Sequence, residues 1–184
     1  MRLFVAIDLP YEVRRNLELL LQMLRPKADI QWSPPSNLHV TTKFIGEWPE
    51  EDLDILKQAL GEIPPPGEFR VDIQGLGWFP NEKNPRVFWA GIRADESLPR
   101  LARATEDACE ALGIAREDRP YSPHLTLARI RRPVDLSPLR KAVETLPSDH
   151  FGRFTATQFH LYESKLRPGG SIYTKIASFP LAAK

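Results

Sequence analysis

The sequence predicts an α+β protein with two pseudo-symmetric antiparallel sheets, helices on their outer faces and a central cleft. Three observations favour this fold. Apolar runs of strand length alternate with longer segments whose apolar residues recur at helical spacing. These elements follow nearly the same order twice, and matching positions lie 85 residues apart. A long unit that occurs twice indicates an internal duplication, so residues 1–184 are expected to form a single bilobal domain.

The first half begins with an apolar run of strand length, followed by a helical pattern between Pro10 and Pro26. A later helix is expected to begin at Pro49, because proline suits the first helical turn and acidic residues follow it. The elements expected in this half are strands over 2–8, 30–32, 38–45, 69–79 and 86–93, and helices over 11–24 and 49–60.

The second half follows the same pattern. Ser97 is a suitable N-cap for a helix that ends at Gly113, and Ser137-Pro138 opens another helix. The elements expected in this half are helices over 97–112 and 137–146, and strands over 123–130, 155–163 and 172–179.

One strand in each half carries the pattern His-x-Thr. His39 and Thr41 are two residues apart, as are His124 and Thr126, so each pair shares one face of its strand. Phe44 is expected on the opposite side, in the core. A single His-x-Thr is most simply a structural histidine. Two copies in repeated surroundings favour a functional pair, because a pseudo-two-fold axis would set the two motifs opposite each other.

Composition excludes several classes of protein. The net charge of +1 is too small for a nonspecific polyanion binder, so any contact with nucleic acid should be local. The single cysteine, Cys109, excludes an internal disulfide, fits a reducing compartment and is expected to be buried and inert. The first apolar run is too short for a signal peptide or a membrane span. The expected location is cytoplasmic, and a monomer is expected.

Two facing histidines can transfer protons near neutral pH: one accepts a proton from the nucleophile, and the other donates a proton to the leaving group. Threonine hydroxyls beside them can donate to the oxygens of a phosphoryl group. This combination favours a cyclic phosphodiester substrate and needs no cofactor. Metal ligation by His39 and His124 stays open as an alternative, although two ligands make a poor metal site. A serine nucleophile is disfavoured, because the sequence has no Gly-x-Ser-x-Gly.

Further residues near the motifs were considered as ligands. Lys43 has the parity of His39 and should reach the substrate side, whereas Arg129 has the opposite parity to His124. Arg129 is therefore either an exposed arginine or a phosphate ligand placed by a local bulge. Tyr121 lies in a polar loop and could stack on a base. Four other residues are interpreted as solvated or structural, although the two arginines could also meet a polynucleotide backbone: Arg131, Arg132, His150 and His160.

A resemblance to a known family rests on four stretches. They are Leu3-Phe4-Val5-Ala6-Ile7, Asn37-Leu38-His39-Val40-Thr41-Thr42-Lys43-Phe44-Ile45-Gly46, Ser122-Pro123-His124-Leu125-Thr126-Leu127-Ala128-Arg129 and Pro168-Gly169-Gly170-Ser171. Over nearly its whole length the chain resembles the two-histidine phosphoesterase superfamily. Within it, the chain is most similar to the bacterial and archaeal RNA 2′,3′-cyclic phosphodiesterases, also called 2′-5′ RNA ligases.

The resemblance implies a metal-independent hydrolysis of a 2′,3′-cyclic phosphate to a 2′-phosphomonoester. It implies that His39 donates a proton to the leaving 3′ oxygen and that His124 activates water. By the same resemblance Thr41, Thr126 and Arg129 hold the phosphate, so Arg129 requires the local bulge. The implied partners are RNA with cyclic phosphate ends, tRNA fragments among them, or cyclic nucleotides, with no membrane. The alternative is a noncatalytic module of the same fold that binds RNA ends or nucleotides.

Overall fold

The computed structural model describes residues 1–183 and has the α+β architecture that the sequence predicts. The strands are β1 (Arg2–Asp8), β2 (Gln31–Trp32), β3 (His39–Glu47), β4 (Phe69–Phe79), β5 (Val87–Ala94), β6 (His124–Arg129), β7 (His150–Ala156), β8 (Gln158–Arg167) and β9 (Gly170–Pro180). The helices are α1 (Tyr11–Leu24), α2 (Leu53–Gly61), α3 (Ser97–Glu110) and α4 (Ser137–Glu144). Within residues 1–183, no helix has the length and apolarity needed to cross a bilayer.

Two expected elements differ in the structure. Helix α2 begins at Leu53 rather than at Pro49, because Glu50–Asp52 form a separate turn of 3₁₀ helix. The strand expected over 155–163 is divided between β7 and β8, which belong to different sheets. The chain passes from one sheet to the other at Thr157, whose carbonyl accepts a hydrogen bond from the backbone N–H of Leu181.

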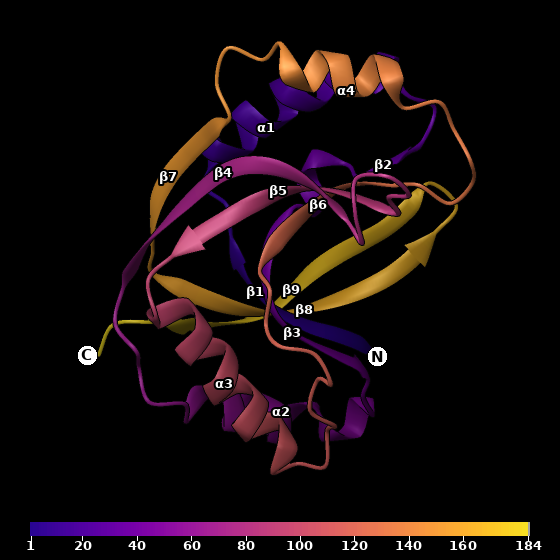
Figure 1. The fold of residues 1–184 in the computed structure, drawn as a ribbon. Helices are drawn as coiled ribbons and strands as arrows, with labels where there is room; N and C mark the ends of the chain where they lie inside the picture. The colour runs from indigo at the N-terminus through magenta and orange to yellow at the C-terminus, as the bar shows by residue number, and fades with distance from the viewer. Residues whose placement is uncertain (184) are drawn as a thin grey trace.

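The two antiparallel sheets exchange strands between the sequence halves. One sheet has the order β3-β1-β8-β9, and the other has the order β2-β6-β5-β4-β7. At an offset of 85 residues, β1 corresponds to β5 and β3 corresponds to β6. Strand β4 corresponds to residues 154–164, which span the end of β7 and most of β8. Thus β3-β1-β8 and β6-β5-β4 have equivalent pairings, although each sheet contains strands from both halves (Figure 1).

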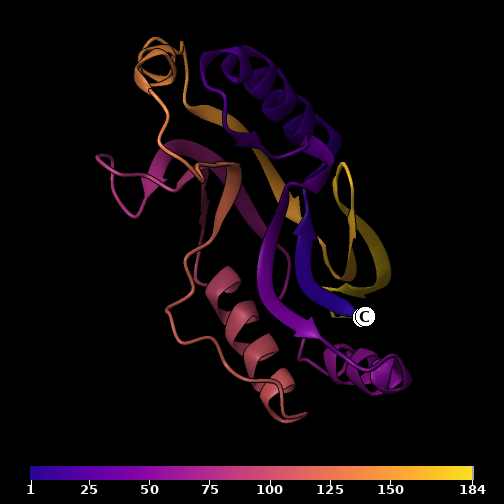
Figure 2. The ribbon, with the colours of Figure 1, turned by 90° about the vertical axis from the view of Figure 1, so that its right-hand side faces the viewer.

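The helices lie in two pairs at opposite ends of the molecule, with the sheets between them. Helices α1 and α4 lie at one end and α2 and α3 at the other (Figures 1 and 2). Each long helix packs on the sheet that contains the motif strand of the other half. Asn16 of α1 donates a hydrogen bond to the carbonyl of Phe151 in β7, and Glu106 of α3 forms an ion pair with Lys43 of β3.

One continuous hydrophobic core joins both sheets to the helices. Fully buried side chains in it include Val5 of β1, Leu17 and Leu21 of α1, Leu101 of α3 and Leu125 of β6. Complete burial of each such side chain contributes about 1.5–3 kcal/mol. The opposite face of each sheet carries His-x-Thr, and we call this the motif face. The core therefore supports both motifs from behind.

Candidate active site

Strand β3 carries the first motif at an irregularity in its pairing with β1. Thr41 pairs with Ala6 and Lys43 pairs with Val5, so Thr42 is an extra residue between them. Its Oγ1 donates a hydrogen bond to the carbonyl of Val5 at 3.2 Å. Such a β-bulge reverses the faces of the side chains that follow it as far as the next irregularity, which in β3 lies between Phe44 and Gly46.

Strand β6 has the same bulge at the equivalent position. Its register shift falls between Thr126 and Ala128, which makes Leu127 the extra residue. Arg129 is consequently brought to the motif face, beside His124 and Thr126. The local bulge that the resemblance requires for Arg129 is therefore present.

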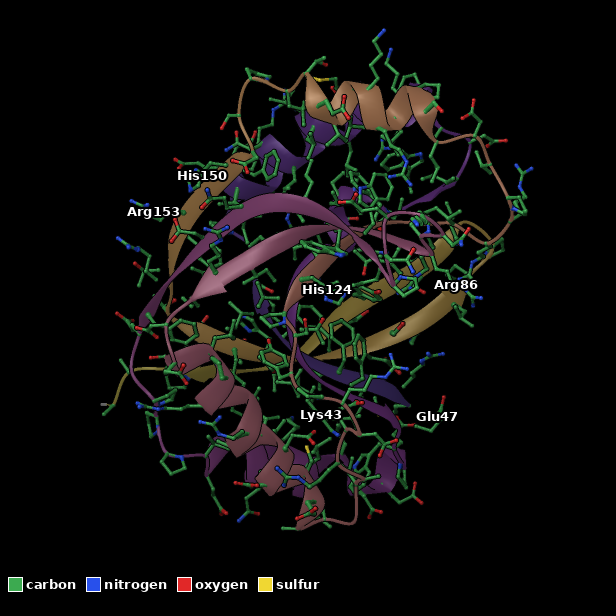
Figure 3. All side chains as sticks on the ribbon, in the orientation of Figure 1. Lys43, Glu47, Arg86, His124, His150 and Arg153 are labelled. Atoms are coloured by element: carbon green, nitrogen blue, oxygen red, sulfur yellow. The ribbon has the colours of Figure 1, made fainter. Side chains whose placement is uncertain are left out.

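The bulge in β3 corrects two predictions. Lys43 does not reach the motif face: its side chain is buried, and Nζ lies 2.5 Å from Oε1 of Glu106 and 2.7 Å from the carbonyl oxygen of Ala115 (Figure 3). Phe44 is not in the core: it is 66% exposed and lies beside Phe4 on the motif face, with ring centroids 6.2 Å apart. Strict alternation placed both on the wrong side because it did not include the extra residue.

The two motif histidines make the same hydrogen bond to the backbone. Nδ1 of His39 lies 3.3 Å from the carbonyl oxygen of Asn37, and Nδ1 of His124 lies 2.9 Å from that of Ser122. A carbonyl accepts only from a protonated nitrogen, so in the neutral imidazole Nδ1 carries the hydrogen and Nε2 is the basic atom. In each ring, Nε2 therefore points away from the residues that precede the histidine and is available to react.

A polar cluster that the sequence analysis did not predict adjoins His39. Asp8 is its centre: Oδ1 lies 3.6 Å from Nε2 of His39, and Oδ2 lies 3.3 Å from Nε2 of His160 and 2.6 Å from Nζ of Lys175. The hydroxyl of Tyr162 also donates to Oδ1 of Asp8. His160 is thus buried and shares Asp8 with a motif histidine, so of the two roles expected for it, solvated or structural, the solvated one is wrong. His160 and Tyr162 are two residues apart in β8 and therefore share one face of that strand, and this spacing could have placed His160 beside Tyr162.

Burial and neighbouring charges set the protonation of this cluster. Burial raises the pKa of Asp8, but hydrogen bonds from Lys175 and Tyr162 outweigh it and hold that pKa below its usual value. Burial lowers the pKa of His39, and the nearby Asp8 carboxylate opposes this shift. Burial lowers the pKa of His160 as well. Asp8 is therefore ionised beside two histidines that tend to be neutral.

Aromatic rings lie beside both histidines. The ring of His39 lies 4.7 Å from that of Tyr162 and 5.9 Å from that of Tyr173. On the other sheet, the ring of Phe79 lies 5.1 Å from His124 in an edge-on arrangement. Such rings limit the access of water, which strengthens charge interactions at the site.

Each motif is tied to the segment that leads into the other motif. The hydroxyl of Ser33, which precedes the first motif, donates to the carbonyl of Thr126 at 2.8 Å. The hydroxyl of Tyr121, which precedes the second, donates to the carbonyl of Thr41 at 2.8 Å. Thr41 and Thr126 are equivalent positions next to the bulges, where ladder pairing is interrupted. We call these two hydrogen bonds the reciprocal links.

The position of Tyr121 differs from the one predicted for a base-stacking residue. Its ring is half-buried against the core, burial raises the pKa of its hydroxyl, and that hydroxyl is bound to the backbone of Thr41. Tyr121 therefore connects the two motif strands instead of presenting a free ring.

Tyr173 of β9 lies beside the first motif histidine and senses the charge of Arg129 from the second motif strand. Burial raises the pKa of Tyr173, and the charge of Arg129 acts in the opposite direction. The same ring lies 5.9 Å from His39. The pKa of Tyr173 therefore responds to a charge on the second motif strand, while its ring lies beside the first histidine.

The remaining chemically active side chains lie elsewhere. His150 is exposed and pairs with Asp72 at 3.2 Å, away from His124 (Figure 3). Cys109 is buried, as expected, and burial raises its pKa to about 11. Among residues 1–183, no group of three or more His, Cys, Asp or Glu side chains is arranged to hold a metal ion.

Comparison with known families gives a match over nearly the whole chain. A model of LigT-like phosphoesterases matches residues 7–89 and 92–173. An RNA 2′,3′-cyclic phosphodiesterase of Archaeoglobus fulgidus is 34% identical over 97% of this chain and 99% of the relative. A protein of the same name from Thermus thermophilus is 37% identical over 98% of this chain and 90% of the relative.

Solved structures resemble the whole fold. The crystal structure of TT0787 from Thermus thermophilus superposes with a TM-score of 0.80 at 37% identity and covers 98% of both chains. The structure of Escherichia coli LigT complexed with 3′-AMP superposes with a TM-score of 0.78 at 27% identity and covers 99% of this chain and 98% of that one.

Proposed function

The chain belongs to the LigT-like phosphoesterase family, and we propose that it hydrolyses the 2′,3′-cyclic phosphate ends of RNA to 2′-phosphomonoesters. The single observation that carries this proposal is the repetition of the site. Two bulged strands each present a histidine and a threonine, and each histidine is held by a carbonyl through Nδ1. The family and the names of the relatives supply the class of substrate.

The proposed reaction assigns a different role to each histidine. Nε2 of His124 accepts a proton from water, and the water oxygen attacks phosphorus. The bond from phosphorus to the 3′ oxygen breaks, and His39 gives that oxygen its proton. The product carries the phosphate on the 2′ oxygen. With a 5′-hydroxyl in place of water, the same step forms a 2′-5′ linkage.

Three residues are proposed to hold the phosphoryl group. The hydroxyls of Thr41 and Thr126 donate to its oxygens, and the guanidinium of Arg129 balances the charge that develops in the transition state. The bulge supports the role of Arg129, because without it the side chain would lie on the opposite face. The exposed ring of Phe44 offers a surface on which a base can stack.

Hydrolysis of a cyclic mononucleotide tests this function. His39→Ala and His124→Ala should each lower kcat about 10²–10⁴-fold, because each removes one proton transfer. His150→Ala is the matched control, since that histidine is exposed and distant from the site. Product binding should fall less than turnover, because Thr41, Thr126 and Arg129 remain.

The same assay tests independence from metals. We expect full activity after exhaustive chelation, because neither motif has carboxylates at ligand spacing. Activity that is lost on chelation and restored by one divalent ion would contradict the mechanism. Nucleotide binding without turnover, in a correctly folded protein, would favour the noncatalytic alternative.

A further inference from the structure

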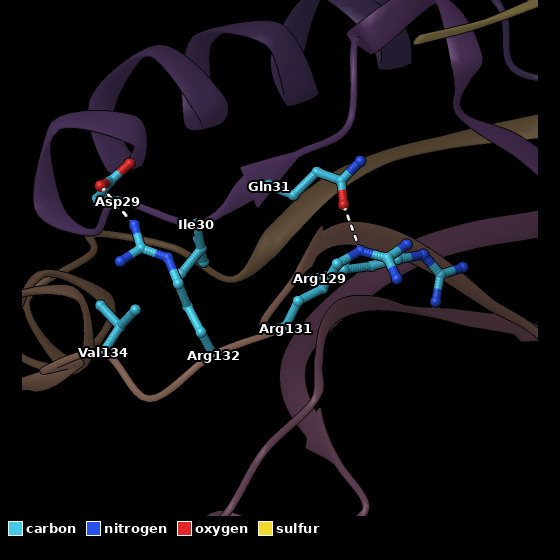
Figure 4. Close-up of a pocket in the computed structure, with 7 residues that line it drawn as sticks. All are labelled: Asp29, Ile30, Gln31, Arg129, Arg131, Arg132 and Val134. Carbon is cyan, nitrogen blue, oxygen red and sulfur yellow. Dashed lines mark hydrogen bonds and ion pairs between the residues drawn. The ribbon is translucent and has the colours of Figure 1, made fainter. Parts of the chain in front are cut away.

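A basic pocket lies at the end of β6, next to the motif face. It has a volume of about 310 Å³ and is lined by three arginines together with Asp29 and Gln31 (Figure 4). The arginines are Arg129, Arg131 and Arg132. The proposed phosphate ligand Arg129 is therefore also part of this second feature, which the function described above does not use.

The pairing of β2 with β6 builds this pocket. Gln31 pairs directly with Arg129, so their side chains share one face. The chain stays attached to the sheet beyond β6, because the N–H of Ile130 donates to the carbonyl of Arg86 at 2.9 Å. The pocket therefore continues the motif face along the edge of the sheet.

Two of the guanidinium groups are held by partners across the pocket. Nε of Arg131 donates to Oε1 of Gln31 at 2.6 Å, and Nη2 of Arg132 lies 2.8 Å from Oδ2 of Asp29 (Figure 4). Among the lining residues, Arg129 alone of the three arginines makes no such contact. Each guanidinium has five N–H donors, so these contacts orient the groups and leave donors for a ligand.

The charge of the pocket favours an anion. Three arginines face one carboxylate, while the whole chain has a net charge of only +1. The planar donors of arginine match phosphate oxygens. The positive charge is thus concentrated next to Arg129, where the rest of an RNA strand would extend from its reacting end.

We propose that this pocket binds the phosphodiester that precedes the cyclic end of an RNA strand. The inference rests on the proposed function and makes an oligonucleotide the preferred substrate over a mononucleotide. Arg129 and Arg131 are two residues apart, about 6–7 Å along an extended chain, which is close to the separation of neighbouring phosphates in a strand. Arg129 then contacts the reacting phosphate, and Arg131 and Arg132 contact the next one.

The ratio of the kcat/KM values for two substrates tests the proposed role of the pocket. Values of kcat/KM are measured for a cyclic mononucleotide and for a trinucleotide with the same cyclic 3′ end. We expect the wild-type protein to prefer the trinucleotide. The variant Arg131→Gln/Arg132→Gln should lower the ratio of trinucleotide to mononucleotide about tenfold, as expected for losing charged hydrogen bonds to one phosphate. The salt dependence of trinucleotide binding should also weaken, with the log–log slope falling by about 0.7.

The matched control makes the same change in charge elsewhere. The control variant Arg70→Gln/Arg93→Gln alters two arginines that line another pocket. That pocket lies at the C-terminal end of β5, next to Ala94. This control should leave the trinucleotide-to-mononucleotide ratio of kcat/KM unchanged. If the control lowers that ratio as much as the pocket variant does, the effect comes from overall charge and the pocket is not a subsite.

Other outcomes separate this inference from the proposed function. If wild-type protein hydrolyses both substrates with equal kcat/KM, the pocket proposal is overturned while the function stands. If neither is hydrolysed, the proposed function fails, and the binding of a trinucleotide product to the same variants still decides the role of the pocket. If the double variant unfolds, Arg132→Gln alone is used, because its exposed ion pair with Asp29 contributes little to stability.

Discussion

His39 has to be protonated to donate a proton, yet it is buried in the free protein. Burial lowers its pKa, and the phosphate anion of a bound substrate would raise it again. The charged and titratable groups around it come from four elements: Asp8 of β1, His160 and Tyr162 of β8, Tyr173 and Lys175 of β9, and Arg14 of α1. The alkaline limb of kcat/KM, which reports the free enzyme, should therefore lie below pH 6.5, the usual pKa of histidine.

Asp8 and Lys175 should shift this limb in opposite directions. Asp8→Asn removes the negative charge 3.6 Å from His39, so the pKa of His39 falls and the alkaline limb moves to lower pH. Lys175→Gln removes a positive charge that lowers the same pKa, so the limb moves to higher pH. The measurement is the pH profile of kcat/KM for a cyclic mononucleotide.

The opposite signs distinguish electrostatics from damage to the fold. Both variants break the 2.6 Å contact between Asp8 and Lys175, so a purely structural role would change activity in the same way in both. Shifts in one direction for both variants, or a loss of amplitude with no shift, would show that Asp8 does not tune His39.

At the scale of single elements, the equivalent bulges decide which residues reach the site. The bulge in β6 could be expected from the resemblance at Arg129. The 85-residue offset then places Thr42 at the position of Leu127 and Phe44 at the position of Arg129, so the same offset predicts the bulge in β3. The offset also places Lys43 at the position of Ala128, on the core face, but it does not identify the partner of the lysine. A lysine normally lies at the surface, and its burial depends on Glu106, which is distant in the sequence.

Lys43 is expected to hold β3 against α3 rather than to bind substrate. Lys43→Met should lower the free energy of unfolding by about 3 kcal/mol, because it leaves the Glu106 carboxylate without its partner. The double variant Lys43→Met/Glu106→Gln should recover part of this loss. Urea unfolding measures both. A much reduced affinity for nucleotide with unchanged stability would instead restore the ligand role.

The same pair should contribute to stability in a pH-dependent way. Burial raises the pKa of Glu106, but the hydrogen bond from Lys43 outweighs it and holds the pKa below its usual value. The stabilisation is therefore fully present above the unfolded pKa of 4.5 and is lost as the pH falls through the lower folded value. Wild type and Lys43→Met should accordingly converge in stability in acid.

At the scale of the whole molecule, the correspondence of elements at an offset of 85 residues could be predicted, but the exchange of strands could not. The offset correctly matched helices α1 and α3 and the two motif strands. It could not say which sheet each strand would join, because equivalent strands have equivalent local patterns and can pair within or between halves. In the structure the chain returns to the first sheet through β8 and β9, so both sheets depend on both halves.

We expect the reciprocal links to fix the distance between the two motifs, because each joins the segment before one motif to the strand of the other. Tyr121→Phe and Ser33→Ala each remove one hydrogen bond, at a cost of about 1 kcal/mol in stability. Each should lower kcat about tenfold with little change in KM, because small displacements of reacting groups reduce rates strongly. Tyr11→Phe, a change at an exposed tyrosine, is the control.

The two links should also act together. Since both set the same separation, the double variant Ser33→Ala/Tyr121→Phe should lose less activity than the product of the two single losses, while its stability losses add. Kinetic and unfolding measurements on all four proteins complete this cycle. If kcat stays constant while stability falls, the links support the fold alone, and the distance between the motifs is set by the packing of β3 and β6 on the shared core.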